Sequence, residues 1–145
     1  MNHDDYNDKY IIDVLKDTKT VAMVGASANW NRPSFFAMKY MQQKGFRIIP
    51  VNPGVAGQAI LGETVMADLD EIDEPIDMVD IFRNSEAAGS ITDDAIKVGA
   101  KIVWMQLGVR NDDAARRAED AGLRVVMNRC PKIEYARLYG ELSWH

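Results

Sequence analysis

The chain has 145 residues, of which 47% are hydrophobic and 27% charged, so it is long and apolar enough to bury the core of one folded domain. The formal net charge of −5 argues against general binding to nucleic acid, for which a basic face is expected. The charge is uneven, because eight acids and no Lys or Arg lie between Arg47 and Arg83. Without those acids the rest of the chain would carry +3.

Cysteine and histidine are scarce, which excludes several kinds of site. The single cysteine, Cys130, cannot form an internal disulfide, so a disulfide-stapled scaffold is excluded. The two histidines, His3 and His145, lie near the ends of the sequence, so almost no side chains are available for a Cys or His zinc site or for an internal Ser-His-Asp triad. The acidic start is unlike a signal peptide, and no apolar run approaches about 20 residues. We therefore expect a cytoplasmic protein with no membrane partner.

The apolar pattern alternates between short β-rich runs and segments of helical period. Taken along the chain, it predicts a helix around 10–15, a strand at 20–24, a helix around 35–41 that stops at Gly45, a strand at 46–51, a loop at 52–63, a short helix at 66–72, a strand at 76–82, a helix at 85–98, a strand at 101–106, a helix from Asn111 to Gly122, a strand at 123–127 and a helix at 133–142.

Two of these helices have recognisable starts. Ser85 is predicted to cap the helix at 85–98. Asn111 is a strong N-cap candidate because Asp112 and Asp113 follow it and face the positive end of the helix dipole.

Strands separated by helices predict an open, doubly wound α/β sheet. The strands are almost wholly apolar, as expected when helices cover both faces of a parallel sheet. We therefore predict a single Rossmann-like domain over residues 1–145, with a mostly parallel five-stranded sheet and a helical extension at residues 1–17.

Ligands of such sheets bind beyond the carboxyl ends of the strands. Four of the five segments at those ends carry an arginine: Arg32, Arg83, Arg110 and Arg129. A chain that is anionic overall is thus predicted to present a cationic edge to a polyphosphate ligand.

The first of these segments, Gly25-Ala26-Ser27, has the small residues that let backbone N–H groups approach a phosphate. It is neither a G-x-G-x-x-G fingerprint, because Ser27 and Trp30 stand at the second and third glycine positions, nor a Walker loop. Arg32 is either a clamp for a phosphate or a solvated loop charge. The second strand is followed by Asn52 with no acid before Glu63, which disfavours a conventional NAD site.

Together these segments resemble the stand-alone CoA-binding domain proteins, which are similar to the N-terminal CoA-binding domain of the succinyl-CoA synthetase alpha subunit. The resemblance covers roughly residues 18–138 and rests on the order and spacing of several short pieces. These are Val24-Gly25-Ala26-Ser27, Arg32-Pro33-Ser34, Ile49-Pro50-Val51-Asn52-Pro53, Phe82-Arg83, Ala95-Ile96, Gly99-Ala100-Lys101, Trp104-Met105-Gln106-Leu107-Gly108-Val109 and Asn128-Arg129-Cys130.

The resemblance implies a coenzyme A site across the switch point of the sheet. The Gly25 loop would cradle the pyrophosphate, the Asn52-Pro53 turn would flank the adenosine, and Phe82 with Arg83 would line the adenine or phosphate region. The implied site comprises Gly25, Ala26, Ser27, Arg32, Pro33, Ser34, Asn52, Pro53, Phe82, Arg83, Gln106, Gly108, Asn128, Arg129 and Cys130. One departure is Val55, where the synthetase subunits place a lysine, so either the cation for the 3′-phosphate comes from elsewhere, with Arg32 and Arg83 as candidates, or the affinity is modest.

The resemblance implies binding of CoA or an acyl-CoA without catalysis, because the phosphorylated histidine of the synthetase lies in a domain absent from this sequence. The alternatives are an NAD(P)-dependent oxidoreductase, an acyl-CoA ligase component that needs a partner enzyme, and a ligand-free interaction domain. A homodimer is an open expectation. Hydrolase chemistry at Ser27 is rejected because no base accompanies it.

A few residues keep two interpretations. Cys130 is either a reactive thiol or a small buried hydrophobe. Trp30 is either a lid over a ligand or a contact with a partner. Trp104 is interpreted as core. Asp80, within a strand, either pairs with Arg83 or stays near solvent.

Overall fold

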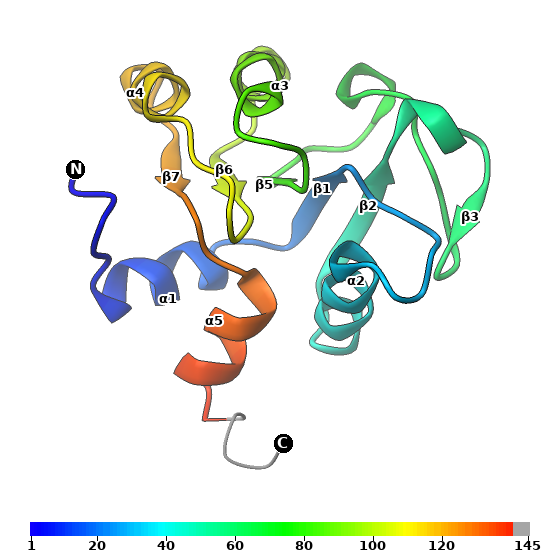
Figure 1. Ribbon diagram of the computed structural model, residues 1–145, viewed down its shortest axis with the longest axis horizontal. Coiled ribbons are helices and arrows are strands. Elements are labelled where there is room, and N and C mark those ends of the chain that lie inside the picture. The colour runs from blue at the N-terminus through cyan, green and yellow to red at the C-terminus, as the bar shows by residue number, and fades with distance from the viewer. Residues whose placement is uncertain (141–145) are drawn as a thin grey trace.

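A computed structural model describes residues 1–140 of the chain as three layers, with a sheet between two sets of helices (Figure 1). The elements in chain order are α1 (Asp8–Lys16), β1 (Thr20–Val24), α2 (Pro33–Gln43), β2 (Arg47–Val51), η1 (Pro53–Val55), β3 (Ala59–Ile60), β4 (Glu63–Thr64), η2 (Leu69–Glu71), β5 (Met78–Ile81), α3 (Ala87–Lys97), β6 (Ile102–Met105), α4 (Asp112–Asp120), β7 (Arg124–Val126) and α5 (Pro131–Leu138). Residues 141 and 142 of the last predicted helix lie outside the described residues.

The main sheet has five parallel strands in the order β2-β1-β5-β6-β7. The chain first moves outward from β1 to β2 and then returns to the other side of β1 with β5. The switch point therefore lies between the carboxyl ends of β1 and β5, where an open sheet of this kind leaves a crevice for ligands. The predicted Rossmann-like α/β fold is confirmed.

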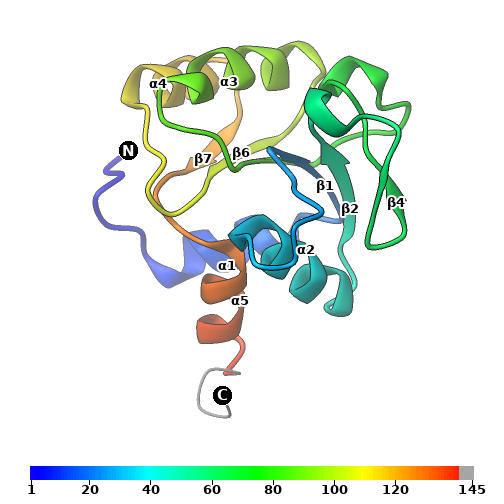
Figure 2. The ribbon, with the colours of Figure 1, turned by 45° about the vertical axis from the view of Figure 1, so that its right-hand side comes forward.

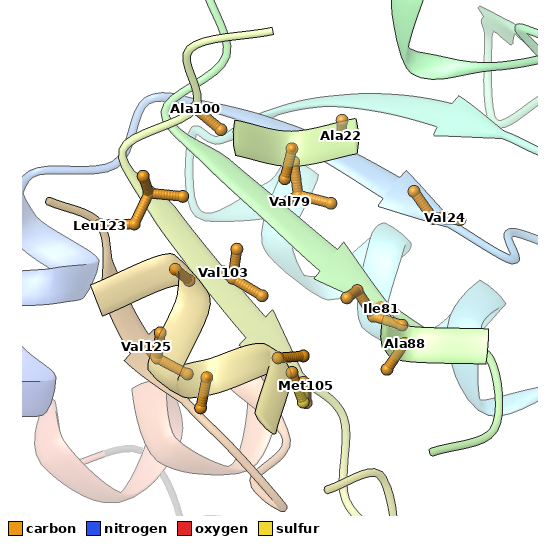
Figure 3. Packing of buried hydrophobic residues seen from close by; sticks show 14 of the residues in the cluster. Ala22, Val24, Val79, Ile81, Ala88, Ala100, Val103, Met105, Leu123 and Val125 are labelled. Atoms are coloured by element: carbon orange, nitrogen blue, oxygen red, sulfur yellow. The ribbon is translucent and has the colours of Figure 1, made fainter. Parts of the chain in front are cut away.

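Helices cover both faces of the sheet, as the apolar strands predict. Helices α3 and α4 lie on one face, and α1, α2 and α5 lie on the other (Figures 1 and 2). Neighbouring residues of a strand point to opposite faces, so Ala22 and Val24 belong to the core beneath α3 and α4, whereas Val21 and Met23 belong to the other core. Figure 3 shows the first of these cores packed around Val103.

The crossover from β2 to β5 differs from its prediction. The predicted loop contains the 3₁₀ turn η1 and a small hairpin of β3 and β4. The predicted short helix at 66–72 is wrong, because its only helical residues form the single 3₁₀ turn η2 and Met66 forms a bridge beside Val51.

The two predicted helix caps have different outcomes. The Asn111 side chain accepts a hydrogen bond from the N–H of Ala114, which confirms it as the cap of α4. Ser85 does not cap α3: the side chain of Asn84 accepts from the N–H of Ala87, whereas the Ser85 hydroxyl accepts from the N–H of Arg110. Ser85 instead ties the start of α3 to the loop before α4.

Asp80 contradicts both of its predicted environments. It lies in β5 between Met23 of β1 and Trp104 of β6, is 0% exposed, and neither carboxyl oxygen has a partner among the described residues. Neither Arg83 nor solvent reaches it. Burial raises the pKa of the Asp80 carboxyl well above its usual range. Trp104 is fully buried, which confirms its interpretation as core.

The helices are short. Within residues 1–140, none is both long and apolar enough to span a lipid bilayer.

Candidate functional site

A hollow of about 530 Å³ opens at the switch point, beyond the carboxyl ends of β1, β5 and β6. It is lined by Gly25, Ser27, Arg32, Pro33, Ser34, Phe82, Gln106, Leu107 and Val109. All but Leu107 and Val109 are residues that the sequence predicts for the site. The hollow therefore brings together residues from three segments that are far apart in the chain.

Gly25 forms the tight turn that begins the first loop. Its N–H donates to the carbonyl of Val51 at the end of β2, and its φ of +92° lies in the region that favours glycine. A Cβ at this position would lie 3.0 Å from the Phe82 carbonyl oxygen and 3.0 Å from Cδ of Arg83. Gly25 is therefore required both by its backbone conformation and by the close approach of the β5 end.

The positive end of α2 faces the same hollow. Arg32 is the N-cap residue of this 11-residue helix, Pro33 follows it, and no side chain caps the first turn. Ser34, in that turn, is 4% exposed and lines the hollow. An uncapped helix start beside a guanidinium attracts anions because the helix dipole is positive at this end, although the N–H groups of Phe35 and Phe36 already donate to the carbonyl of Arg32.

A smaller hollow of about 180 Å³ lies near the ends of β1 and β2. Its walls are mainly apolar, and its polar side chains are Arg83, Asp68 and Asp94. Phe82 and Arg83 line different hollows, as consecutive residues of an extended segment do when their side chains point to opposite sides. The predicted pair thus contributes one residue to each hollow.

Two asparagines hold the loops of this edge in place. The Asn52 side chain donates to the carbonyl of Ala26 and accepts from the N–H of Gly54, both at 2.9 Å, which joins the first loop to the second. The Asn128 side chain accepts from the N–H of Gly108 at 2.7 Å and so joins the last two loops. Both amides brace the loops, and neither residue lines the larger hollow.

The four predicted edge arginines fall into two pairs. Arg110 contacts the carboxylates of Asp4 and Asp112. The guanidinium of Arg129 donates to the carbonyl of Asn128, lies 3.8 Å from a carboxylate oxygen of Glu134 and stands over the ring of Tyr6.

In contrast, the ion pairs of residues 1–140 include neither Arg32 nor Arg83. The predicted cationic edge is therefore reduced to these two residues, because Arg110 and Arg129 are neutralised or bonded within the protein.

The described lining of the larger hollow does not include Cys130 or Trp30. Cys130 is a half-buried free thiol at the N-cap of α5, so it is not fully enclosed in the core. Trp30 is 70% exposed on the first loop.

Sequence reasoning missed several lining residues. Asp68 lies in the crossover from β2 to β5, and Asp94 lies in α3. Both line the smaller hollow together with Pro53, although the segment directly after β2 contains no acid. Leu107 and Val109 were part of a strand-end segment, and their apolar character gave no signal of a binding role.

The parallel sheet, with its switch point beside a glycine-led loop, defines a Rossmann-like protein. Residues 19–136 match the CoA binding domain family, and the chain belongs to this family. The resemblance inferred from the sequence is thereby confirmed.

Relatives share most of this length. The chain is 36% identical over 126 residues to the uncharacterized protein YneT of Bacillus subtilis (strain 168), covering 87% of this chain and 92% of that protein. A hypothetical protein from Pyrococcus horikoshii OT3 has a similar structure, with a TM-score of 0.89, 35% identity and 97% of each chain covered. The structure of cell-free ID.343 from Thermus thermophilus gives a TM-score of 0.87 with 32% identity, covering 92% of this chain and 99% of that chain.

Proposed function

We propose that this protein binds coenzyme A, free or as an acyl-CoA, across the carboxyl edge of its sheet and catalyses no reaction on it by itself. The observation that carries the proposal is that Arg32 and Arg83, which line the two hollows beside the Gly25 turn, have no ion-pair partner within residues 1–140. Membership of the CoA binding domain family supports the identity of the ligand.

The first loop suits a pyrophosphate. Gly25 lets the first loop turn tightly against the β5 end at the edge of the hollow, and the uncapped start of α2 directs a positive potential at the hollow. Arg32 adds a full charge that can donate two parallel hydrogen bonds to phosphate oxygens. These groups are what a diphosphate requires, and they carry no preference for one base or sugar.

The smaller hollow suits the adenosine and its 3′-phosphate. Apolar walls such as Val51 and Leu69 can pack against a purine, and the carboxylates of Asp68 and Asp94 can accept hydrogen bonds from ribose hydroxyls or an amino group. Arg83, in the same hollow, is the cation available for a phosphate on the ribose. This arrangement favours a ribose that carries a phosphate, which coenzyme A has and NAD lacks.

Binding without catalysis is proposed because of the lining of the larger hollow. Its described lining residues include no Asp, Glu, His, Lys or Cys. These are the side chains that usually act as general bases, so the described lining offers no such group. Ser27 lines the hollow, and its hydroxyl oxygen accepts from the N–H of Asn29 at 3.1 Å. A serine without an adjacent base is a poor nucleophile.

Calorimetric titration with CoA, dephospho-CoA, NAD and NADP tests the proposal. We expect CoA to bind most tightly, dephospho-CoA to bind more weakly, and NAD to bind weakest, because Arg83 has a ribose phosphate to contact in CoA alone among these three. Titration with NADP tests the alternative of an NAD(P)-binding oxidoreductase, because NADP also carries a phosphate on its ribose. No heat and no thermal shift with CoA, or a clear preference for NADP, would overturn the proposed function.

A further inference from the structure

The amide of Gln106 is buried with one of its atoms unpaired. Gln106 is one of the residues that line the larger hollow and is 8% exposed, and its Oε1, which is itself buried, has no hydrogen-bond partner among residues 1–140. The backbone of the same residue is fully engaged, because its N–H donates to the carbonyl of Ile81 and its carbonyl accepts from the N–H of Val109 at 2.7 Å. The unmet acceptor therefore belongs to the side chain alone.

A buried acceptor without a partner is costly, so such an atom in a folded protein calls for an explanation. Asp80 and Thr92 also carry buried oxygens that have no partner in the described part of the chain, but both residues are 0% exposed. Gln106 differs because it borders a hollow large enough to admit a ligand. A ligand in that hollow can supply the missing donor.

We propose that the β6 end of the hollow is the subsite for the uncharged pantetheine arm of the ligand, and that Oε1 of Gln106 accepts a hydrogen bond from an amide N–H or the hydroxyl of that arm. This inference rests on the proposed function and adds which end of the hollow holds the pantetheine arm of the ligand. A phosphate at neutral pH offers oxygen acceptors and few donors, so it does not satisfy a carbonyl oxygen. The pantetheine arm carries two amide N–H groups and one hydroxyl.

The surroundings of Gln106 support an uncharged occupant. Leu107 and Val109 follow Gln106 in the chain and are apolar, and apolar Phe82 follows β5 between them and the first loop, which contributes Arg32 and Ser27. Leu107 is 58% exposed, so an arm with methyl groups lying across it would cover apolar surface that now meets water. The two ends of the hollow thus match the two halves of the ligand, one charged and one neutral.

The loop that carries Gln106 is braced before any ligand arrives. The bond from Gly108 to the side chain of Asn128 and the bond from Val109 to the carbonyl of Gln106 close the turn. A loop whose backbone is already held loses less freedom on binding than a mobile one does, which makes a hydrogen bond from that loop worth more.

The test compares two ligands on a Gln106→Met variant, which keeps the length of the side chain and removes its acceptor. The ligands are CoA and adenosine 3′,5′-bisphosphate, which has the charged nucleoside portion and no pantetheine arm. We expect the variant to bind CoA about 5 to 10 times more weakly than the unmodified protein and the bisphosphate equally well within about twofold, in titration calorimetry. Gln43→Met, at the exposed carboxyl end of α2, is the matched control and should change neither affinity.

The outcomes separate this inference from the proposed function. Equal losses for both ligands, or no loss for CoA, would overturn the subsite while leaving CoA binding intact. Failure of the unmodified protein to bind CoA would overturn both. If Gln106→Met does not fold by circular dichroism, the side-chain amide signal of Gln106 in a ¹⁵N NMR spectrum of the unmodified protein decides: it should shift with CoA and stay in place with the bisphosphate, and a shift with both would contradict the subsite.

Discussion

The two halves of the carboxyl edge of the sheet use arginine in opposite ways. On the half formed by β1 and β5, Arg32 and Arg83 have no ion pair within residues 1–140 and line the two hollows. On the half formed by β6 and β7, Arg110 and Arg129 are held by carboxylates, a carbonyl and an aromatic ring. A strand-end arginine is therefore available to a ligand only where no acid of the same protein reaches it.

The difference arises from residues that lie far apart in sequence. Asp4, near the start of the chain, crosses to Arg110 beside α4, and Glu134 of α5 approaches Arg129. These contacts attach the N-terminal segment and α5 to the sheet. The β6 and β7 half of the edge thus uses its cations for contacts within the protein, whereas the cations of the β1 and β5 half have no ion pair within residues 1–140 and, in the proposed function, contact the ligand.

The largest expected effect comes from Gly25→Ala. The new Cβ would press against the Phe82 carbonyl at 3.0 Å, so the loop must move and the hollow must change shape. We expect CoA affinity to fall about 100-fold, equivalent to about 3 kcal/mol, as measured by titration calorimetry.

Gly45→Ala is the control for that variant. Gly45 has a similar φ of +95°, and a Cβ there would meet nothing within 4 Å. Both variants should lose about 1–2 kcal/mol of unfolding free energy from backbone strain, measured in urea, but Gly45→Ala should bind CoA normally. Equal losses of CoA affinity would mean that strain, and not the shape of the first loop, governs binding.

The second prediction compares Arg32→Ala with Arg110→Ala. A guanidinium bound to phosphate contributes about 1.5–3 kcal/mol, so Arg32→Ala should weaken CoA binding roughly 10- to 100-fold. Arg110→Ala should leave CoA affinity within about twofold, because that side chain is paired with Asp4 and Asp112. A larger loss from Arg110→Ala than from Arg32→Ala would reverse the assignment of the two halves.

Arg83→Ala sharpens the comparison within the β1 and β5 half. If Arg83 contacts the 3′-phosphate, its removal should abolish most of the preference for CoA over dephospho-CoA, a change of about tenfold. Arg32→Ala should weaken both ligands in proportion, since both contain the pyrophosphate. Titration of the two ligands against the two variants gives the answer, and a retained preference in Arg83→Ala would assign the 3′-phosphate to another group.

The smallest expected effect on binding belongs to Asp80→Asn, which changes the pH dependence of stability instead. Burial raises the folded-state pKa of Asp80 above its ordinary value of 3.8, so the folded protein retains a proton that the unfolded chain releases above about pH 4. Stability should therefore fall as the pH rises through the window between these two pKa values, by at most about 1.4 kcal/mol per pH unit.

The Asn variant cannot titrate and should lack this contribution. Urea unfolding from pH 4 to pH 8 should show the stability of the unmodified protein falling relative to that of Asp80→Asn as the pH rises. Parallel curves would show that Asp80 keeps the same pKa in both states.

The sequence was sufficient to predict the sheet, because each strand is an apolar run bounded by turn residues. It was insufficient for the β3–β4 hairpin, whose two-residue turn is Leu61-Gly62 with φ values of 49° and 85°. Such turns are usually recognised by Asn-Gly or Gly-Gly, and Leu in the left-handed region gives no such signal. The short helix predicted at 66–72 failed because a bridge at Met66 drew that segment toward β2.

The candidate site was predictable where it depends on one segment and unpredictable where it depends on several. Gly25 and Arg32 could be identified from a strand end followed by a helix start. The ion pair between Asp4 and Arg110 spans 106 residues, and the entry of Asp94 into the smaller hollow depends on how α3 packs. No local pattern encodes either contact, because each arises only when the layers have assembled.

We propose that the ligand extends along the hollow from the β1 and β5 ends to Gln106 after β6 and leaves the paired side chains of Arg110 and Arg129 undisturbed. Hydrogen–deuterium exchange of the full chain, with and without saturating CoA, measures this directly. Exchange should slow at the backbone amides of residues 25–34 and around Gln106, and should stay unchanged at residues 112–120 of α4. Unchanged exchange at residues 25–34, or protection confined to α4 and the N-terminal segment, would contradict the account.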